Sequence, residues 1–351
     1  MALKKINLEN VMKSKVTSAL IVLALLLLFN LFFTKNFFVI TIKDGHLFGT
    51  LIDILNRGAP VMLLSMGMTL VIASTGGVDL SVGAVTAMSG AMACMLIGGQ
   101  MGFARIQGVV PTEAQTPMAL AILVALLLSM LIGLWNGFVV AYGKIQPIVA
   151  TLVLMVAGRG IAQLITKGQI VTIYYQPFFF IGGGWVLGLP FAIFIVIFVF
   201  IIAQIFTRRT SLGLFIASVG GNADASWYAG INEKAVKLFS FVFCAFCAGV
   251  AGLIICSNVK SADANNTGLN LELDAILATV IGGTNLAGGK FSLTGSLVGG
   301  LLIQTLTTTI YAFGVPPEVT LVVKALVVVV VCFLQSSVAG NFFTKLIRGR
   351  A

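Results

Sequence analysis

The sequence predicts an all-α, polytopic integral membrane protein that forms a single transmembrane domain over residues 1–351. Hydrophobic residues make up 59% of the chain and charged residues only 9%, whereas soluble domains carry about 25% charged residues. Apolar runs of about 20 residues, the length that crosses a bilayer as a helix, recur along the whole chain. Glycine-rich breaks interrupt some of these runs, so we expect broken or re-entrant segments among the helices.

About ten apolar runs are candidates for membrane crossings. They cover residues 17–33, 54–73, 80–98, 118–141, 147–166, 185–206, 238–257, 275–290, 292–312 and 318–336. The eighth run is short and contains a glycine pair, which favours a broken or re-entrant helix. The first run has the basic start of a signal peptide, but no small-x-small cleavage site precedes Thr34, so we expect it to be retained.

The distribution of basic residues predicts that both termini lie in the cytoplasm. If the spans are numbered as above, thirteen basic residues fall in inward-facing segments: Lys4, Lys5, Lys13, Lys15, Lys144, Arg208, Arg209, Lys234, Lys237, Lys290, Lys345, Arg348 and Arg350. Six fall in outward loops: Lys35, Lys43, Arg57, Arg105, Lys167 and Lys260. Cytoplasmic loops of membrane proteins are enriched in Lys and Arg. The net charge of +10 therefore reflects topology and requires no nucleic-acid partner.

A short capped helix is predicted in the basic segment between the sixth and seventh spans. Asn222 is a good N-cap residue, and Asp224 falls in the first turn, where a carboxylate meets the positive end of the helix dipole. Gly230 can adopt the left-handed conformation that ends a helix. A helix of about two turns is unstable in water by itself. We therefore expect it to dock against a soluble partner, although an ordinary surface loop with local caps is the plainer alternative.

The sequence holds no nucleotide-hydrolysing motif. A P-loop needs a glycine-rich loop followed by Lys and then Ser or Thr. In the nearest segment, the spacing from Gly283 to Lys290 is one residue too long, and Phe291 stands where the hydroxyl residue belongs. The cysteines lie in or beside apolar spans and His46 has no second ligand nearby, so we expect no metal site or other cofactor. If ATP drives this protein, a partner chain must hydrolyse it.

Polar residues inside the spans are candidates for a substrate path, because ionisable groups at membrane depth usually face a cavity or each other. Thr75 and Asp79 lie in a glycine-rich break at 74–81, where Asp79 either lines a path or caps the following helix. Arg159 and Gln163 are one turn apart on one helix face and either line the path or bond to nearby backbone. Asp274 immediately precedes the eighth run.

Two stretches, 61–97 and 275–312, share the pattern of an apolar helix, a glycine break and another apolar helix. This pattern weakly suggests an internal repeat of the kind found in many transporters.

Four blocks of the chain resemble, in the same order, motifs of the sugar-importing ABC permeases that serve ribose, xylose, arabinose, galactose and related sugars. They are Thr75-Gly-Gly-Val-Asp-Leu-Ser81, Pro147-Ile-Val-Ala-Thr-Leu152 with Arg159-Gly160, Ala217–Ile231, and Asp274–Gly289. The third block is similar to the ATPase-coupling loop of that family, with Ser226 in place of an alanine. The resemblance assigns coupling to Gly220, Gly221, Asn222, Asp224, Ala225 and Gly230.

Three further segments are most similar to galactofuranose permeases within that family: 53–57, 133–137, which contains Asn136, and 261–266. The resemblance implies a monosaccharide permease without ATPase activity, in the cytoplasmic (inner) membrane of a bacterium. Its implied partners are an ATP-binding-cassette ATPase, an extracytoplasmic sugar-binding protein and a second permease chain, identical or related. The path residues would be Thr75, Asp79, Asn136, Arg159, Gln163 and Asp274. An ABC permease for another pentose or hexose, and a secondary transporter driven by an ion gradient, remain the alternatives.

Overall fold

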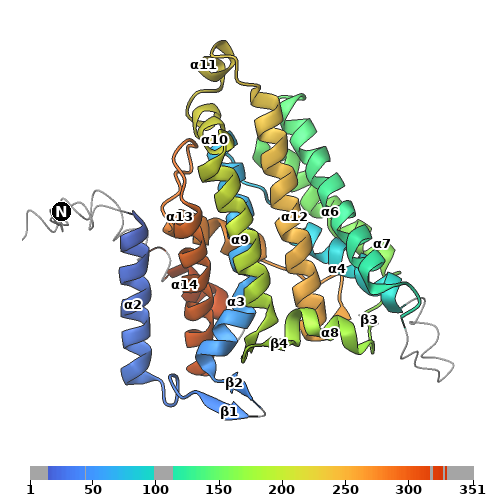
Figure 1. Ribbon diagram of the computed structural model, residues 1–351, viewed down its shortest axis with the longest axis vertical. Coiled ribbons are helices and arrows are strands. Elements are labelled where there is room, and N and C mark those ends of the chain that lie inside the picture. Colours follow the sequence, from blue (N-terminus) through green and yellow to red (C-terminus); the bar gives the residue numbers. More distant parts are fainter. Residues whose placement is uncertain (1–14, 44, 99–113, 317–318, 327–328, 330–351) are drawn as a thin grey trace, which may run out of the picture.

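The computed structural model describes residues 15–43, 45–98, 114–316, 319–326 and 329, and most of them are helical (Figure 1). The helices are α2 (Lys15–Phe33), α3 (Thr50–Thr75), α4 (Val82–Gly98), α6 (Met118–Ala141), α7 (Pro147–Ile165), α8 (Gln176–Gly183), α9 (Phe191–Arg209), α10 (Leu212–Gly221), α11 (Ala223–Tyr228), α12 (Glu233–Val259), α13 (Leu271–Ile281) and α14 (Leu293–Ala312). Residues 319–326 add a further helical segment.

Six short strands form three antiparallel pairs, which an all-α prediction does not include. The strand β1 (Thr41–Lys43) pairs with β2 (His46–Phe48), β3 (Val171–Thr172) with β6 (Ser261–Ala262), and β4 (Trp185–Val186) with β5 (Leu189–Pro190). All three pairs lie at one end of the molecule, which we call the strand end. The helices α10 and α11 lie at the opposite end, called the α11 end (Figure 1).

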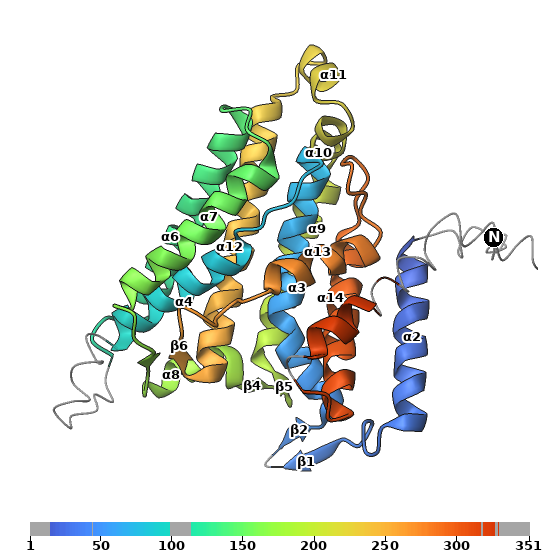
Figure 2. The ribbon, with the colours of Figure 1, turned by 180° about the vertical axis from the view of Figure 1, so that it is seen from behind.

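The core is built on α3 and α12, which lie side by side and run in opposite directions (Figures 1 and 2). Large apolar side chains of α3, including Met62, Leu63 and Met66, are fully buried. The outer helices α6, α7 and α9 instead expose apolar side chains such as Leu131, Val153 and Phe198. Exposed apolar faces around a packed centre are what a bilayer requires of a helical membrane protein.

Six of the described helices are long and apolar enough to cross a membrane: α3, α6, α7, α9, α12 and α14. Most helix boundaries in the structure lie close to the span boundaries predicted from the sequence, with two corrections. The sixth run does not begin at residue 185, because residues 185–190 form the β4–β5 hairpin and the helix begins at Phe191. Arg57, expected in a loop, lies inside α3.

The eighth apolar run, 275–290, is helical only in its first part, which belongs to α13. The helix α13 has 11 residues and ends at Ile281. Its length is about 16 Å, roughly half of the hydrocarbon thickness. Residues 282–290 form glycine-rich turns, because positive φ angles at Gly283, Gly288 and Gly289 suit glycine and end the helix. The expectation of a short, interrupted segment is therefore confirmed.

The helix packing shows a repeat in a different place from the one that the sequence suggested. The helices α3, α4 and α6 are matched by α12, α13 and α14, because α3 packs on α14 and α13 as α12 packs on α6 and α4. The two sets run in opposite directions (Figures 1 and 2). Both α4 and α13 follow a non-helical segment, and Gly83 in the first turn of α4 lies against Gly268, before α13, and Glu272, in the first turn of α13. The pairing of 61–97 with 275–312 is not supported.

Candidate functional site

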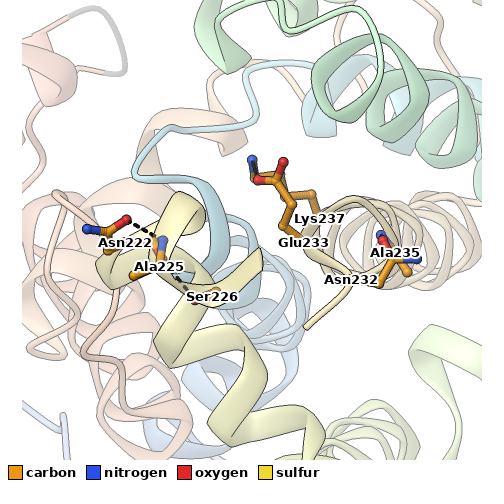
Figure 3. Close-up of polar contacts among 7 residues, drawn as sticks. All are labelled: Asn222, Ala225, Ser226, Asn232, Glu233, Ala235 and Lys237. Carbon is orange, nitrogen blue, oxygen red and sulfur yellow. Dashed lines mark hydrogen bonds and ion pairs between the residues drawn. The ribbon is translucent and has the colours of Figure 1, made fainter. Parts of the chain in front are cut away.

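The capped helix expected from the sequence is present as α11, joined directly to α10. The side-chain oxygen of Asn222 accepts a hydrogen bond from the backbone N–H of Ala225 at 2.9 Å, and the Ser226 hydroxyl donates to the Asn222 carbonyl at 2.8 Å (Figure 3). Asp224 lies in the first turn. These bonds satisfy backbone groups that a helix start leaves free, so a six-residue helix has a defined position at the α11 end.

Gly230 ends this helix with a φ of 82°, in the left-handed region. Its N–H donates to the Trp227 carbonyl at 2.9 Å, and the next N–H, of Ile231, donates to the Ser226 carbonyl at 3.0 Å. An added Cβ at Gly230 would meet no described atom within 4 Å. Glycine is therefore favoured here by backbone conformation and not by lack of space.

Two aromatic side chains of α11 are exposed, although sequence reasoning did not select them. Trp227 is 63% exposed and Tyr228 is 82% exposed, with their rings 5.2 Å apart. They line an open groove of about 880 Å³ together with Asp224, Gly230, Ile231, Asn232, Glu233, Lys234 and, from the turn after α6, Lys144. This surface could have been predicted from the sequence, because two adjacent large aromatic residues lie in a helix that is too short to bury them.

The opposite side of this segment is fixed tightly to α3. An added Cβ at Gly220 would lie only 1.6 Å from the carbonyl oxygen of Ala73, near the end of α3. The same carbonyl accepts a hydrogen bond from the N–H of Gly289 at 2.9 Å. Gly221, in contrast, has open space at its Cβ position. Of the three glycines assigned to coupling, Gly220, Gly221 and Gly230, only Gly220 has a described atom within 4 Å of an added Cβ.

The glycine-rich break between α3 and α4 connects the contact of Gly220 with Ala73 to the second sequence motif, which begins at Pro147. Thr75 accepts a hydrogen bond from the N–H of Gly77 at 3.1 Å and so closes the first turn of the break. An added Cβ at Gly77 would lie 2.7 Å from the ring of Pro147, the first residue of α7. The N–H of Leu80 donates to the Thr151 hydroxyl at 3.1 Å. All four sequence motifs therefore meet around residues 73–81.

Asp79 is 1% exposed, and its carboxylate accepts hydrogen bonds from another residue of the protein. Its Oδ1 accepts hydrogen bonds from the backbone N–H and the hydroxyl of Ser81, at 2.9 and 2.6 Å. The amide of Asn136 donates to the same Ser81 hydroxyl at 2.9 Å. The structure therefore brings Asp79 and Asn136 together through Ser81, in the turn that precedes α4, which favours the capping interpretation.

Arg159 and Gln163 share a face of α7, as expected, and both contact the segment between β6 and α13. The Arg159 guanidinium donates to the backbone carbonyls of Ala264 and Thr267, and the Gln163 amide donates to Asn265 Oδ1 at 2.6 Å. Sequence reasoning did not select Asn265 for a site. A stretch of Asp, Asn and Thr between two apolar spans was the signal for it.

Asp274 faces another element. It forms an ion pair of 3.0 Å with Lys324, in the helical segment 319–326. Neighbouring Glu272 is 5% exposed, and its Oε2 has no hydrogen-bond partner among the described residues. Asp274 therefore fixes α13 to a late segment of the chain and does not join the other path candidates.

These features define a multi-pass helical membrane protein, with a short capped helix at one end and interrupted helices in its centre. The chain belongs to the family described as the permease component of the branched-chain amino acid transport system, whose model matches residues 50–332. A permease component moves the substrate and is not the ATPase of such a system.

Curated relatives carry the names of sugar transporters. The chain is 47% identical to the galactofuranose transporter permease protein YtfT of Escherichia coli over 94% of this chain and 91% of that one. It is 35% identical to the fructose import permease protein FruF of Bifidobacterium longum, over 98% and 94%. It is 36% identical to the ribose import permease protein RbsC of Haemophilus influenzae, over 80% and 83%. No solved structure matches the chain.

Proposed function

We propose that this chain is the permease subunit of an ATP-binding-cassette importer for a monosaccharide, with galactofuranose as the best-supported substrate. The identity of 47% with a galactofuranose transporter permease supports this sugar over fructose and ribose, whose permeases are 35% and 36% identical. The observation that carries the mechanism is the α10–α11 segment. It exposes Trp227 and Tyr228 on one side and contacts α3 through Gly220 on the other.

We place the α11 end in the cytoplasm of a bacterial cell and the strand end outside its cytoplasmic membrane. Arg208 and Arg209 end α9 and Lys234 and Lys237 lie in the first turns of α12, all at the α11 end, and cytoplasmic segments carry such an excess. The helix α2 then begins inside. With about ten crossing or partly crossing segments, both termini are cytoplasmic.

In this proposal the ATPase binds the surface of α11 and holds the nucleotide, and this chain holds no cofactor. Closure of the ATPase on ATP moves α10 and α11 together. Because Gly220 lies directly against Ala73 and the turn at 285–290, that motion reaches the end of α3 and the start of α14. It then reaches the break at 76–81 and Pro147, which alters access to the centre of the molecule.

The other partners are an extracytoplasmic binding protein, which delivers sugar at the strand end, and a second permease chain. The path is enclosed between the two permease chains. The broad outer surfaces of α6 and α7, which this chain leaves exposed, are available for the second chain and for lipid. The second chain is either a copy of this one or a related permease.

Uptake into proteoliposomes tests the proposal. The permease is reconstituted with its ATPase, its second permease chain and its binding protein. Import of labelled galactofuranose is then compared with import of D-ribose, D-fructose, L-arabinose and L-leucine. We expect ATP-dependent import of galactofuranose in preference to the other four. Preferential leucine import, or sugar import without the ATPase, would contradict the proposal.

A further inference from the structure

The segment 263–270, between β6 and α13, enters the molecule from the strand end without regular structure. It begins next to the β3–β6 pair and passes Gly268, whose added Cβ would lie 2.5 Å from the carbonyl oxygen of Gly83. Gly83 is the second residue of α4, which runs obliquely from there towards the strand end (Figure 2). The 16 residues from Gly83 to Gly98 span about 24 Å, so Gly268 lies inside the helix bundle, away from the strand end.

Polar side chains of this segment are exposed where it passes from the strand end into the molecule. Asn265 and Asn266 are both exposed, and each lies within three residues of Gly268. Irregular backbone and exposed amides at membrane depth are stable only where they are surrounded by protein or line a water-filled cavity. This chain leaves these amides uncovered, and an aqueous space beside them would satisfy their hydrogen-bonding groups.

The facing wall of this space is the second half of α7. The Gln163 amide reaches Asn265, and next to Gln163 lies an open groove of about 710 Å³ lined by Ala157, Gly160, Ile161, Gln163, Leu164, Lys167 and Gly168. An added Cβ at Gly160 would meet no described atom within 4 Å. The groove therefore has an apolar, glycine-containing floor, with the Gln163 amide and the Lys167 ammonium as its polar groups.

Arg159 holds the segment in this position. Its guanidinium donates to two carbonyls of the segment, at Ala264 and Thr267, and it also interacts electrostatically with Asp263 and Glu272. Asp263 in turn accepts hydrogen bonds from the backbone N–H groups of Asn265 and Asn266 and from the Asn266 amide. The amide groups are thus set in fixed directions before any ligand arrives.

We infer that Gln163, Asn265 and Asn266 form the sugar-contacting wall of the outer half of the translocation path, with Arg159 as a positioning residue. This inference rests on the proposed function and adds the residues that meet the substrate. Side-chain amides offer a donor and an acceptor to each hydroxyl pair of a neutral, polyhydroxylated ligand, and an apolar floor suits the C–H face of a sugar ring.

Thiol labelling of Asn265→Cys in the assembled complex tests this inference. A charged, membrane-impermeant methanethiosulfonate is added outside proteoliposomes that hold the complex with its strand end outward. The unsubstituted chain is labelled in parallel as background. We expect Asn265→Cys to react and the adduct to block uptake. Galactofuranose at ten times its half-saturating concentration should slow the reaction about tenfold, since only the unoccupied fraction reacts.

Two controls make the result specific. Phe198, on α9, is 65% exposed on the outer apolar face of a candidate membrane span, so Phe198→Cys should not react with the charged reagent. Sucrose in place of the transported sugar should give no protection. The variant Gln163→Leu gives a second measurement, because it should raise the KM for uptake while ATPase assembly stays normal. Gln204→Leu on α9, whose amide bonds to Thr294, should leave KM unchanged.

The outcomes separate this inference from the proposed function. If the unsubstituted complex imports sugar but Asn265→Cys is unreactive, or reacts at the same rate with and without sugar, the inference is wrong and the proposed function stands. If the unsubstituted complex imports no sugar of the panel, both are wrong.

Discussion

The backbone N–H of Gly289 donates a hydrogen bond to the carbonyl oxygen of Ala73 at 2.9 Å, and Gly220 lies against the same carbonyl. Three glycine-rich segments that are far apart in the sequence therefore share one point at the end of α3. Side chains would separate them, so glycine is required there by the close approach of the backbones. This point joins the α10–α11 segment to the rest of the protein.

Substitution of Gly220 should break the link between the docking helix and α3. Gly220→Ala places a methyl group 1.6 Å from the Ala73 carbonyl oxygen, so one backbone must move, at a cost of about 1–3 kcal/mol. We expect lower thermal stability of the purified permease and loss of sugar-stimulated ATP hydrolysis. Gly221→Ala, the neighbouring change into open space, should match the unsubstituted protein in both measurements. Equal behaviour of the two variants would show that the contact is unimportant.

Gly230→Val should weaken ATPase binding through backbone conformation alone. A branched residue at a φ of 82° costs about 1–2 kcal/mol, which should displace the end of α11. Gly230→Asn should retain most of the binding, because Asn tolerates the left-handed region. Co-purification of the ATPase with each variant measures the effect. Membrane insertion should be normal in both, since Gly230 lies outside every helix that could cross the membrane.

The exposed aromatic pair should supply much of the affinity for the ATPase. Trp and Tyr are the side chains most often found as binding hot spots, where truncation to Ala costs about 2 kcal/mol or more. Trp227→Ala and Tyr228→Ala should therefore each weaken ATPase binding by about 30-fold without lowering the thermal stability of the permease. Leu187→Ala, at the strand end and 89% exposed, is the matched control. Affinities within twofold of the unsubstituted chain would exclude α11 as the docking surface.

Asp79→Asn should impair uptake while the complex still assembles. The amide keeps an oxygen that can accept the Ser81 N–H, so the turn before α4 should still form. The amide carries no negative charge, so the 2.6 Å hydrogen bond from the Ser81 hydroxyl becomes weaker. Ser81 is then held less firmly against Asn136. Uptake rate and gel-filtration profile are the two measurements. Full uptake would limit Asp79 to the role of a turn residue.

Labelling of the two ends should confirm the orientation. Leu187→Cys and Tyr228→Cys place thiols at two exposed sites at opposite ends of the molecule. An impermeant maleimide should label the first in intact cells and the second only after the membrane is permeabilised. Labelling of both in intact cells would mean that a crossing segment has been miscounted.

The elements predicted well were those whose signal is local. Long apolar runs gave α6, α7 and α14 nearly to the residue, and the caps at Asn222 and Gly230 were found because capping depends on neighbours in the chain. The hairpin at 185–190 was missed because Trp185, Val186 and Leu187 read as the start of an apolar span. A short strand pair carries little pattern of its own.

The site was harder to predict because its contacts join distant segments. The hydrogen bond between Asp79 and Ser81 follows from their spacing of two residues. The hydrogen bond from Asn136 to Ser81 instead depends on how α6 packs beside α4. Asp274 was assigned to the path because it is charged and lies in an apolar run. Its partner, Lys324, is 50 residues away, and nothing in the sequence relates the two. Contacts of this kind become visible only in three dimensions.

The ion pair between Asp274 and Lys324 has a consequence for how the chain enters the membrane. A lysine near the middle of an isolated helix costs about 2.5–3.5 kcal/mol to insert, and the segment 319–326 would meet that cost if it were released into lipid alone. Asp274 leaves the ribosome first, so its carboxylate is already in place on α13 when Lys324 arrives. The order of synthesis thus supplies the counter-charge before Lys324 needs it, and a chain without Asp274 should insert the segment 319–326 less efficiently.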